Sequence, residues 1–226
     1  MKLLWSVIIN ILLIQAVIAQ DGDTVVLKRR NFQPRIYWDY GKTLMLWSNQ
    51  SKKYEGGLEL LIIDRIQLIA EAGSMEFIPS NLHKNITYQS QGNFYRIGTG
   101  SIAYLDDINR IGLGFRYAKS SFSDMGTTYI NSESGFNAPL NIPFERSDLQ
   151  ATWAEFIVNS EKYIKLKKED PNAAINKRLS LGLMIRYKIL LDYPDYEPIG
   201  VFNIPGYGRL VNNRVLALNL FVKINL

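Results

Sequence analysis

The most reactive combination of side chains in the sequence is a serine, a histidine and a carboxylate. His83 is the only histidine, and Ser80 and Glu76 lie shortly before it. An ester hydrolase uses a hydroxyl, an imidazole base and an orienting acid, so one interpretation is a lipid-modifying enzyme. Proximity in a polar loop, however, does not fix the geometry that such catalysis requires. We predict that no residue is catalytic and keep the lipid-modifying enzyme as an alternative.

Metal chemistry has weaker support. Asp192, Asp195 and Glu197 could bind calcium, but they lack the spacing of an EF-hand loop, and a solvated acidic loop is the simpler interpretation. A single histidine is no zinc ligand set. The chain has 0 cysteines, which excludes disulfides and thiolate-bound metals. We predict no cofactor and no metal.

Charged residues recur on one face of several alternating segments. Inside a narrow barrel such charges must be paired and hydrogen-bonded, and this set contains both acids and bases. An eight-stranded barrel is only wide enough for side chains to fill it. We therefore predict a salt-bridged interior, with a narrow channel as an alternative. The predicted interior charge network consists of Glu55, Glu59, Glu71, Arg96, Arg116, Glu155, Arg186 and Lys188.

The elements that would position these charges are β-strands. Over residues 178–190, Leu, Ile and Tyr at odd positions alternate with Arg, Ser, Gly, Met and Lys at even positions. Residues 213–226 alternate in the same way, so that one face could meet lipid and the other a mixed interior. The predicted signal for the barrel-insertion machinery lies in this last strand and comprises Leu220, Val222, Ile224 and Leu226.

Eight alternating segments can be counted along the chain. Between them, residues 77–91, 122–150 and 191–212 are rich in turn-forming residues and are predicted to be loops. The two longest loops are predicted docking surfaces on a rigid barrel. The predicted strands are residues 36–47, 54–63, 66–76, 93–105, 110–121, 151–166, 178–190 and 213–226.

The N-terminal residues 1–19 are predicted to be a secretory signal peptide. Lys2 precedes an apolar run that Asn10 and Gln15 interrupt, and Ala19 suits cleavage. The run is shorter than the roughly 20 apolar residues of a membrane-spanning helix. Residues 20–226 are predicted to form one domain.

Composition agrees with strands that have two unlike faces. The chain is 47% hydrophobic with a mean hydropathy of −0.07, because alternating faces average out. The net charge of +5 does not indicate nucleic-acid binding. A periplasmic β-sandwich would share the periodicity, but the export signal and strands of about ten residues favour a membrane barrel. The predicted fold is all-β, an eight-stranded antiparallel transmembrane β-barrel of the outer-membrane type.

Several runs resemble an uncharacterised family of small outer-membrane β-barrels found in Bacteroidota. They are residues 112–123, Trp153-Ala154-Glu155-Phe156 and Asn203-Ile204-Pro205-Gly206-Tyr207. The resemblance implies a barrel and a membrane but no established activity, so it assigns no catalytic residue. The chain departs from the family in its longer charged turn at residues 167–177 and in ending at Leu226 rather than at an aromatic residue.

The expected function is a non-catalytic structural or accessory role in the outer membrane of a Gram-negative bacterium. The chain would act alone or as a subunit of a larger assembly or export complex, and the sequence leaves both open. The expected partners are outer-membrane lipids, the barrel-insertion machinery and other outer-membrane proteins, with no nucleic acid.

Overall fold

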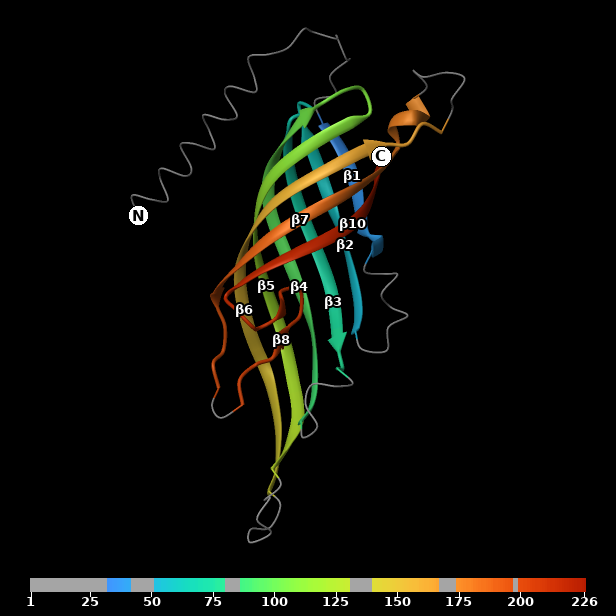
Figure 1. Cartoon of the computed structure of the whole chain (residues 1–226). Helices are drawn as coiled ribbons and strands as arrows, with labels where there is room; N and C mark the ends of the chain where they lie inside the picture. Colours follow the sequence, from blue (N-terminus) through green and yellow to red (C-terminus); the bar gives the residue numbers. More distant parts are fainter. Residues whose placement is uncertain (1–31, 42–50, 80–85, 131–139, 167–173, 197–198) are drawn as a thin grey trace, which may run out of the picture.

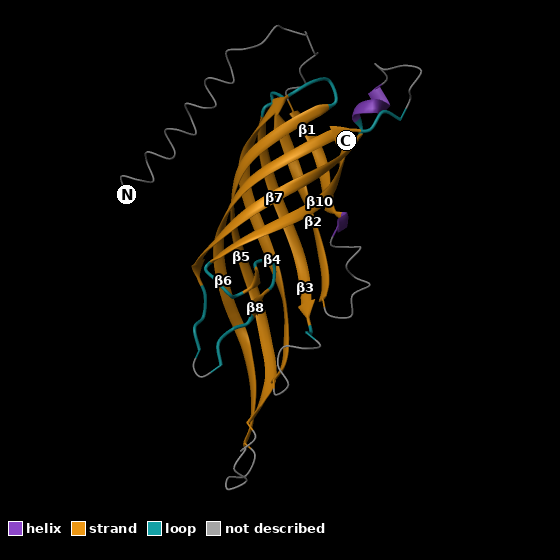
Figure 2. Ribbon diagram, viewed as in Figure 1, coloured by secondary structure: helices purple, strands orange, loops and turns teal. Residues whose placement is uncertain are grey.

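Strands account for most of the described chain. The computed structural model describes residues 32–41, 51–79, 86–130, 140–166, 174–196 and 199–226, so the predicted signal peptide lies outside it. Figure 2 shows long strands and only short helical turns, of which η2 (Ala174–Lys177) is one. No described helix has the length and hydropathy needed to cross a membrane. The strands are β1 (Phe32–Asp39), β2 (Ser51–Ile62), β3 (Ile66–Phe77), β4 (Ile86–Tyr104), β5 (Asn109–Ile130), β6 (Leu140–Tyr163), β7 (Leu179–Asp192), β8 (Asn203–Ile204), β9 (Gly208–Arg209) and β10 (Arg214–Asn225).

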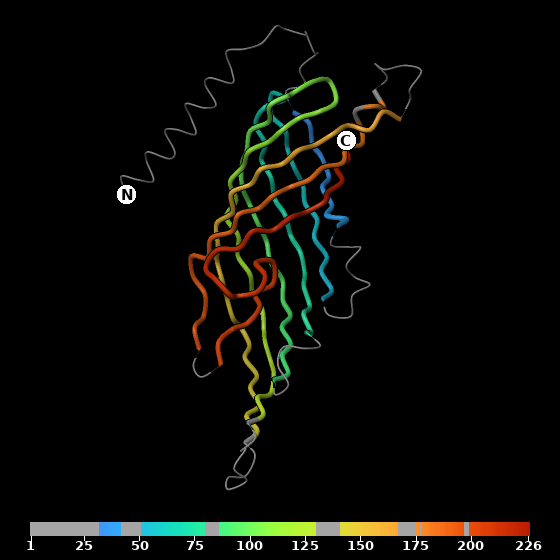
Figure 3. The backbone as a smooth tube through the Cα atoms, in the orientation of Figure 1, coloured from blue at the N-terminus to red at the C-terminus, as the bar shows by residue number. Residues whose placement is uncertain are grey.

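The eight long strands form a closed barrel. Their order around it is β1–β10–β7–β6–β5–β4–β3–β2, and neighbours pair antiparallel. Figure 3 shows how the strands cross the barrel at a tilt. Closure gives the paired segments partners on both sides, which removes the edges of an open sheet. The predicted all-β class with eight antiparallel strands is confirmed.

The barrel has charge inside and large apolar side chains outside. In β10, Leu216 is 71% exposed and Leu218 is 60% exposed, whereas Asn219 and Lys223 are each 1% exposed. The alternation predicted for residues 178–190 is present in β7, where leucines point outward and Arg186 is buried. A sandwich that folds in water would have the opposite arrangement.

Short turns join the strands at one end of the barrel. Between β2 and β3, Ile63 and Asp64 both have positive φ, as a tight hairpin requires, and the predicted Asp64-Arg65 turn is confirmed. Between β4 and β5, the Asp106 carboxylate accepts hydrogen bonds from Asn109 and from the Ile108 amide. These bonds hold the pKa of Asp106 below its ordinary value.

Three strands extend beyond the others at the opposite end (Figures 1 and 3). The loops predicted for residues 77–91 and 122–150 were therefore wrong in large part, because β4 begins at Ile86, β5 continues to Ile130 and β6 begins at Leu140. Ser, Asn, Gln and Thr take most of the outward positions of these extensions, so they lack the regular apolar alternation that marks the rest of each strand. The extensions, residues 86–93, 121–130 and 140–150, are called the arm.

The loop predicted for residues 191–212 was also partly wrong, because it contains the β8–β9 hairpin. This hairpin folds back into the mouth of the barrel (Figure 1). Ile204 and Tyr207 are 0% and 1% exposed, and they join a core cluster with Phe94 and Trp153. Residues 201–210 are called the plug.

The barrel closes at its shortest strand. β1 pairs with β10 over five residues, Arg35 to Asp39. The first strand was predicted too late in the sequence, because β1 begins at Phe32 and residues 42–47 lie outside the described ranges. Pro34 obscures the strand pattern because it cannot donate to a ladder, yet its carbonyl accepts a hydrogen bond from Leu226 N at 3.0 Å.

Two adjacent glycines of β2, Gly56 and Gly57, lie on opposite faces of the barrel wall. A Cβ added at Gly57 would lie 2.8 Å from the Glu71 Cγ, whereas one at Gly56 would lie 3.4 Å from the Tyr37 carbonyl. Gly57→Val should lower the free energy of unfolding by about 1–3 kcal/mol because the interior is overpacked. Urea titration in detergent micelles, followed by tryptophan fluorescence, measures the change.

Gly56→Val is the matched control, since it places the same side chain on the outer face, where β-branched residues favour strands. Equal destabilisation by the two variants would contradict the placement of Gly57 inside and Gly56 outside.

Candidate functional site

The most unusual feature of the molecule is its charged interior. Among the described residues, seven acidic and eight basic side chains are buried. Glu155, Arg96 and Arg186 are 0% exposed. The eight residues predicted to form the interior network all lie on the inner face of the barrel and are buried: Glu55, Glu59, Glu71, Arg96, Arg116, Glu155, Arg186 and Lys188.

Two arginines hold three carboxylates at the centre of the network. Arg186 lies 2.9 Å from Glu55, 2.9 Å from Glu71 and 3.0 Å from Glu155. Arg96 pairs with the same three acids, at 2.8, 3.2 and 2.9 Å. The five strands β2, β3, β4, β6 and β7 are thereby tied together across the lumen. The first cluster consists of Lys53, Glu55, Glu71, Arg96, Arg116, Glu155 and Arg186.

A second cluster lies on the same inner face, towards the end with the short turns. Lys223 lies 2.6 Å from Glu59 and 3.2 Å from Glu161, and Arg35 and Arg110 both pair with Glu161. The sequence prediction grouped Glu59 with the first cluster and missed the other four members of the second, which are Arg35, Arg110, Glu161 and Lys223. Lys223 and Glu161 follow the period-2 pattern and could have been found from it, whereas Arg35 was missed because the first strand was misplaced.

Little space remains between the two clusters. A cavity there, lined by Gln67, Asn159 and Lys223 among others, measures about 10 Å³. That volume is about the least that holds one water molecule. The interior at this level is therefore filled by side chains.

The plug completes the first cluster from the mouth of the barrel. Lys188 donates to the carbonyl oxygens of Gly206 and Tyr207 at 2.7 and 2.8 Å, and Arg96 donates to Gly206 O at 3.1 Å. The first cluster and Lys188 together carry more cations than acids, and these carbonyl dipoles add acceptors for the excess of positive charge. The Trp153 indole, in edge contact with Tyr207, donates to Glu155 at 2.7 Å.

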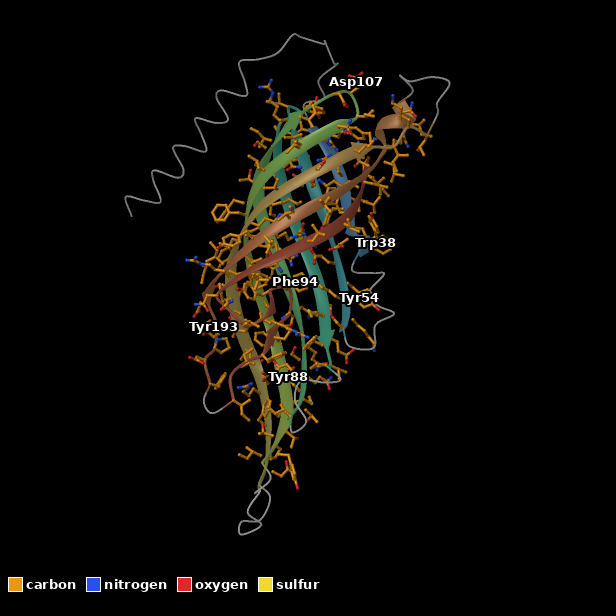
Figure 4. The ribbon with its side chains drawn as sticks, in the orientation of Figure 1. Trp38, Tyr54, Tyr88, Phe94, Asp107 and Tyr193 are labelled. Atoms are coloured by element: carbon orange, nitrogen blue, oxygen red, sulfur yellow. The ribbon has the colours of Figure 1, made fainter. Side chains whose placement is uncertain are left out.

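The base of the arm fastens the outer part of the plug. Arg146 pairs with Asp124 at 2.6 Å and donates to the Ile199 carbonyl at 2.7 Å. Tyr88 donates to Asp124 at 3.1 Å and accepts from the Asn203 amide at 3.3 Å. Burial raises the pKa of Tyr88, and the charge of Asp124 raises it further, so the phenol keeps the proton that it donates. Figure 4 shows Tyr88 and Phe94 on this side of the barrel.

Comparison with known proteins identifies the family of the chain. A family model described as "Domain of unknown function (DUF6048)" matches residues 1–222. The chain belongs to this family. No curated protein and no solved structure matches it. The description of the family as DUF6048 states no activity. What the charged interior of this member can do chemically therefore follows from its geometry.

Only part of the combination considered for ester hydrolysis is described. Ser80 and His83 lie outside the described residues, and Glu76 is engaged with Lys52 at 3.5 Å and with Gln89. Within the described ranges, no group of three or more His, Cys, Asp or Glu residues could hold a metal ion. Of the predicted acidic loop, Asp192 and Asp195 are described and Glu197 is not.

Removing Arg186 tests whether the first cluster supports the fold of this family member. Arg186→Met keeps the length of the side chain but leaves three carboxylates with one fewer partner. Breaking a buried ion pair on one side costs about 3–5 kcal/mol, so we expect a loss of that size in the free energy of unfolding, measured by urea titration. Arg214→Met, at the exposed start of β10, is the control. A loss below about 1 kcal/mol at Arg186 would contradict the assignment.

The seating of the plug can be tested at its turn. Gly206 has φ of +83°, and a Cβ there would meet the Phe94 ring. Gly206→Val should therefore displace the plug and raise the rate of trypsin cleavage after the exposed Arg209 by about fivefold or more, because strain in this region costs about 1–2 kcal/mol. Gly200→Val is the control, since nothing lies within 4 Å of its added Cβ. Equal cleavage of both variants would show that the turn does not hold the plug.

Proposed function

We propose that the chain is an integral outer-membrane β-barrel with a sealed interior and a non-catalytic structural or accessory role. The observation that carries the proposal is the reversed polarity of the barrel. Buried charges are stable only when paired, and exposed leucines on every side of a barrel are stable in hydrocarbon rather than in water. The secretory signal predicted for residues 1–19 supports export to that membrane.

The outer surface changes from apolar to polar at one level around β3 to β6. Ala70, Ile97 and Tyr117 are paired neighbours on the outer face. Two rows nearer the arm, the paired outer residues are polar and exposed: Ser74, Asn93, Ser121 and Gln150. A level boundary of this kind is what the edge of a hydrocarbon layer would impose.

Aromatic residues gather near the same boundary. Trp38 and Tyr54 are 53% and 57% exposed, and Figure 4 shows both on the outside of the barrel. Tyr95 and Tyr117 are 49% and 41% exposed on β4 and β5. Aromatic rings favour the headgroup level of a membrane, which supports an orientation with the arm outside the hydrocarbon and the short turns at its other side.

The filled interior supports an anchoring role over a transport role. Two ion-pair clusters and the plug lie along the barrel axis, and the lipid-facing residues Leu220, Val222, Ile224 and Leu226 are proposed to serve the insertion machinery. The arm offers a surface for docking to larger outer-membrane proteins, so the chain would act alone or as a subunit of their assembly.

Three measurements test this function. We expect the protein to stay in the membrane pellet after a carbonate wash. In gels it should migrate faster unheated than boiled, and it should give no steady current in planar bilayers after verified insertion. Release by carbonate would contradict insertion in the membrane, and a steady current would favour a narrow channel. Purification in mild detergent with mass spectrometry then separates a monomer from a subunit with constant partners.

A further inference from the structure

The outer face of the arm is polar but carries few charges. Its outward positions hold amide and hydroxyl side chains, including Gln89, Gln91, Asn93 and Ser123. Strands that face plain water, particularly at the edge of a sheet, use charged residues such as lysine to prevent association. A long surface of amides and hydroxyls offers hydrogen bonds without charge, and this suits a neighbour that is itself rich in hydroxyl groups.

A groove of about 590 Å³ lies on this outer face. Two rows of outward positions line it, and one of them is formed by Gln89, Met125 and Glu145, which are paired neighbours across β4, β5 and β6. Tyr88, Gly126 and Phe144, from the row between them, complete the lining. Ile78 and Pro143 add apolar surface at its sides. The groove thus combines apolar patches with an amide and a carboxylate. A sugar ring presents C–H groups on its faces and hydroxyl groups at its rim, so these are the contacts that would bind it.

The groove lies beyond the boundary where the outer surface turns polar. On β4, Gln89 is further along the arm than Asn93, which marks the polar row, and than Tyr95, which marks the aromatic level. If the apolar surface lies in hydrocarbon, the first layer outside it is the headgroup layer of the outer leaflet. In a bacterial outer membrane that layer consists of the sugars of lipopolysaccharide.

We propose that the groove around Met125 binds the oligosaccharide headgroup of an outer-leaflet glycolipid. This inference rests on the proposed function, because it takes the position of the membrane from it. Gln89 and Glu145 hydrogen-bond to sugar hydroxyls, and Met125 contacts the C–H face of a ring. The glycolipid then fixes the arm against the membrane surface and holds the barrel at a set depth.

The test uses the full chain, folded in detergent and labelled with ¹³C at its methionine methyl groups. The probe is the lipid-free core oligosaccharide released from lipopolysaccharide, and the titration follows the methyl resonances. Met125 is 37% exposed and lines the groove, whereas Met184 is 1% exposed inside the barrel and serves as an internal control. We expect a saturable shift of Met125 and none of Met184.

Two pairs of variants separate the groove from the rest of the arm. Gln89→Leu removes the amide and should weaken oligosaccharide binding about fivefold, the value of one hydrogen bond, while Gln150→Leu outside the groove should not. Met125→Trp fills the groove and should abolish binding, read from the chemical shifts of the oligosaccharide. Tyr129→Trp, on the same strand and face but outside the groove, should leave it intact.

The outcomes are distinct. No shift with oligosaccharide, a shift with lipid A or inorganic phosphate only, or equal weakening by Gln89→Leu and Gln150→Leu would each overturn the site. Because the probe carries no lipid, the titration does not depend on membrane insertion. A chain that washes out with carbonate yet binds the oligosaccharide at Met125 would contradict the proposed function while supporting the sugar site.

Discussion

Arg186 organises the interior of the barrel through its ion pairs with three carboxylates. An arginine buried in a narrow lumen is stable only if its donors are satisfied, and Arg186 draws Glu55, Glu71 and Glu155 to itself from three other strands. Those contacts fix which residues of β2, β3, β6 and β7 can face inward. Because side chains alternate along a strand, fixing the inner face also fixes the apolar outer face.

The need to satisfy buried positive charge also explains the position of the plug. Cations outnumber acids around the first cluster, and the hairpin turn supplies carbonyl oxygens to Lys188 and Arg96. The turn can approach so closely because Gly206 adopts a positive φ and has no side chain to displace the Phe94 ring. The plug is thus part of the interior, and the mouth of the barrel is filled by a loop of the same chain.

Sequence reasoning succeeded where a physical pattern is local and failed where it is not. The alternation in β7 and β10 shows directly which side chains face inward, and so the buried positions of Arg186, Lys188 and Glu155 followed from counting. The arm was missed because residues such as Gln89 and Ser123 are polar, as loop residues often are, and a strand outside an apolar layer has no hydrophobic period. The hydrogen bonds to the Gly206 carbonyl could not be predicted, because no sequence rule pairs a turn carbonyl with a lysine on another strand. The membrane and the role remain proposals, because the family supplies no activity.

The strands of the barrel differ greatly in length. β1 and β10 close the ring over five residues, whereas β4, β5 and β6 continue far beyond it as the arm. Three strands that leave the barrel have no wall to support their inner face, so the plug, fastened through Asp124 and Arg146, supports it at the base. Their outer face has no such partner within the described residues, yet it is long, carries few charges and is rich in amides. A surface of this composition gains most from a hydroxyl-rich neighbour, because each amide can then exchange a hydrogen bond with water for one with a sugar without burying a charge. In the proposed function, the filled barrel anchors the chain and the polar arm makes its contacts, so the two parts of the structure are complementary.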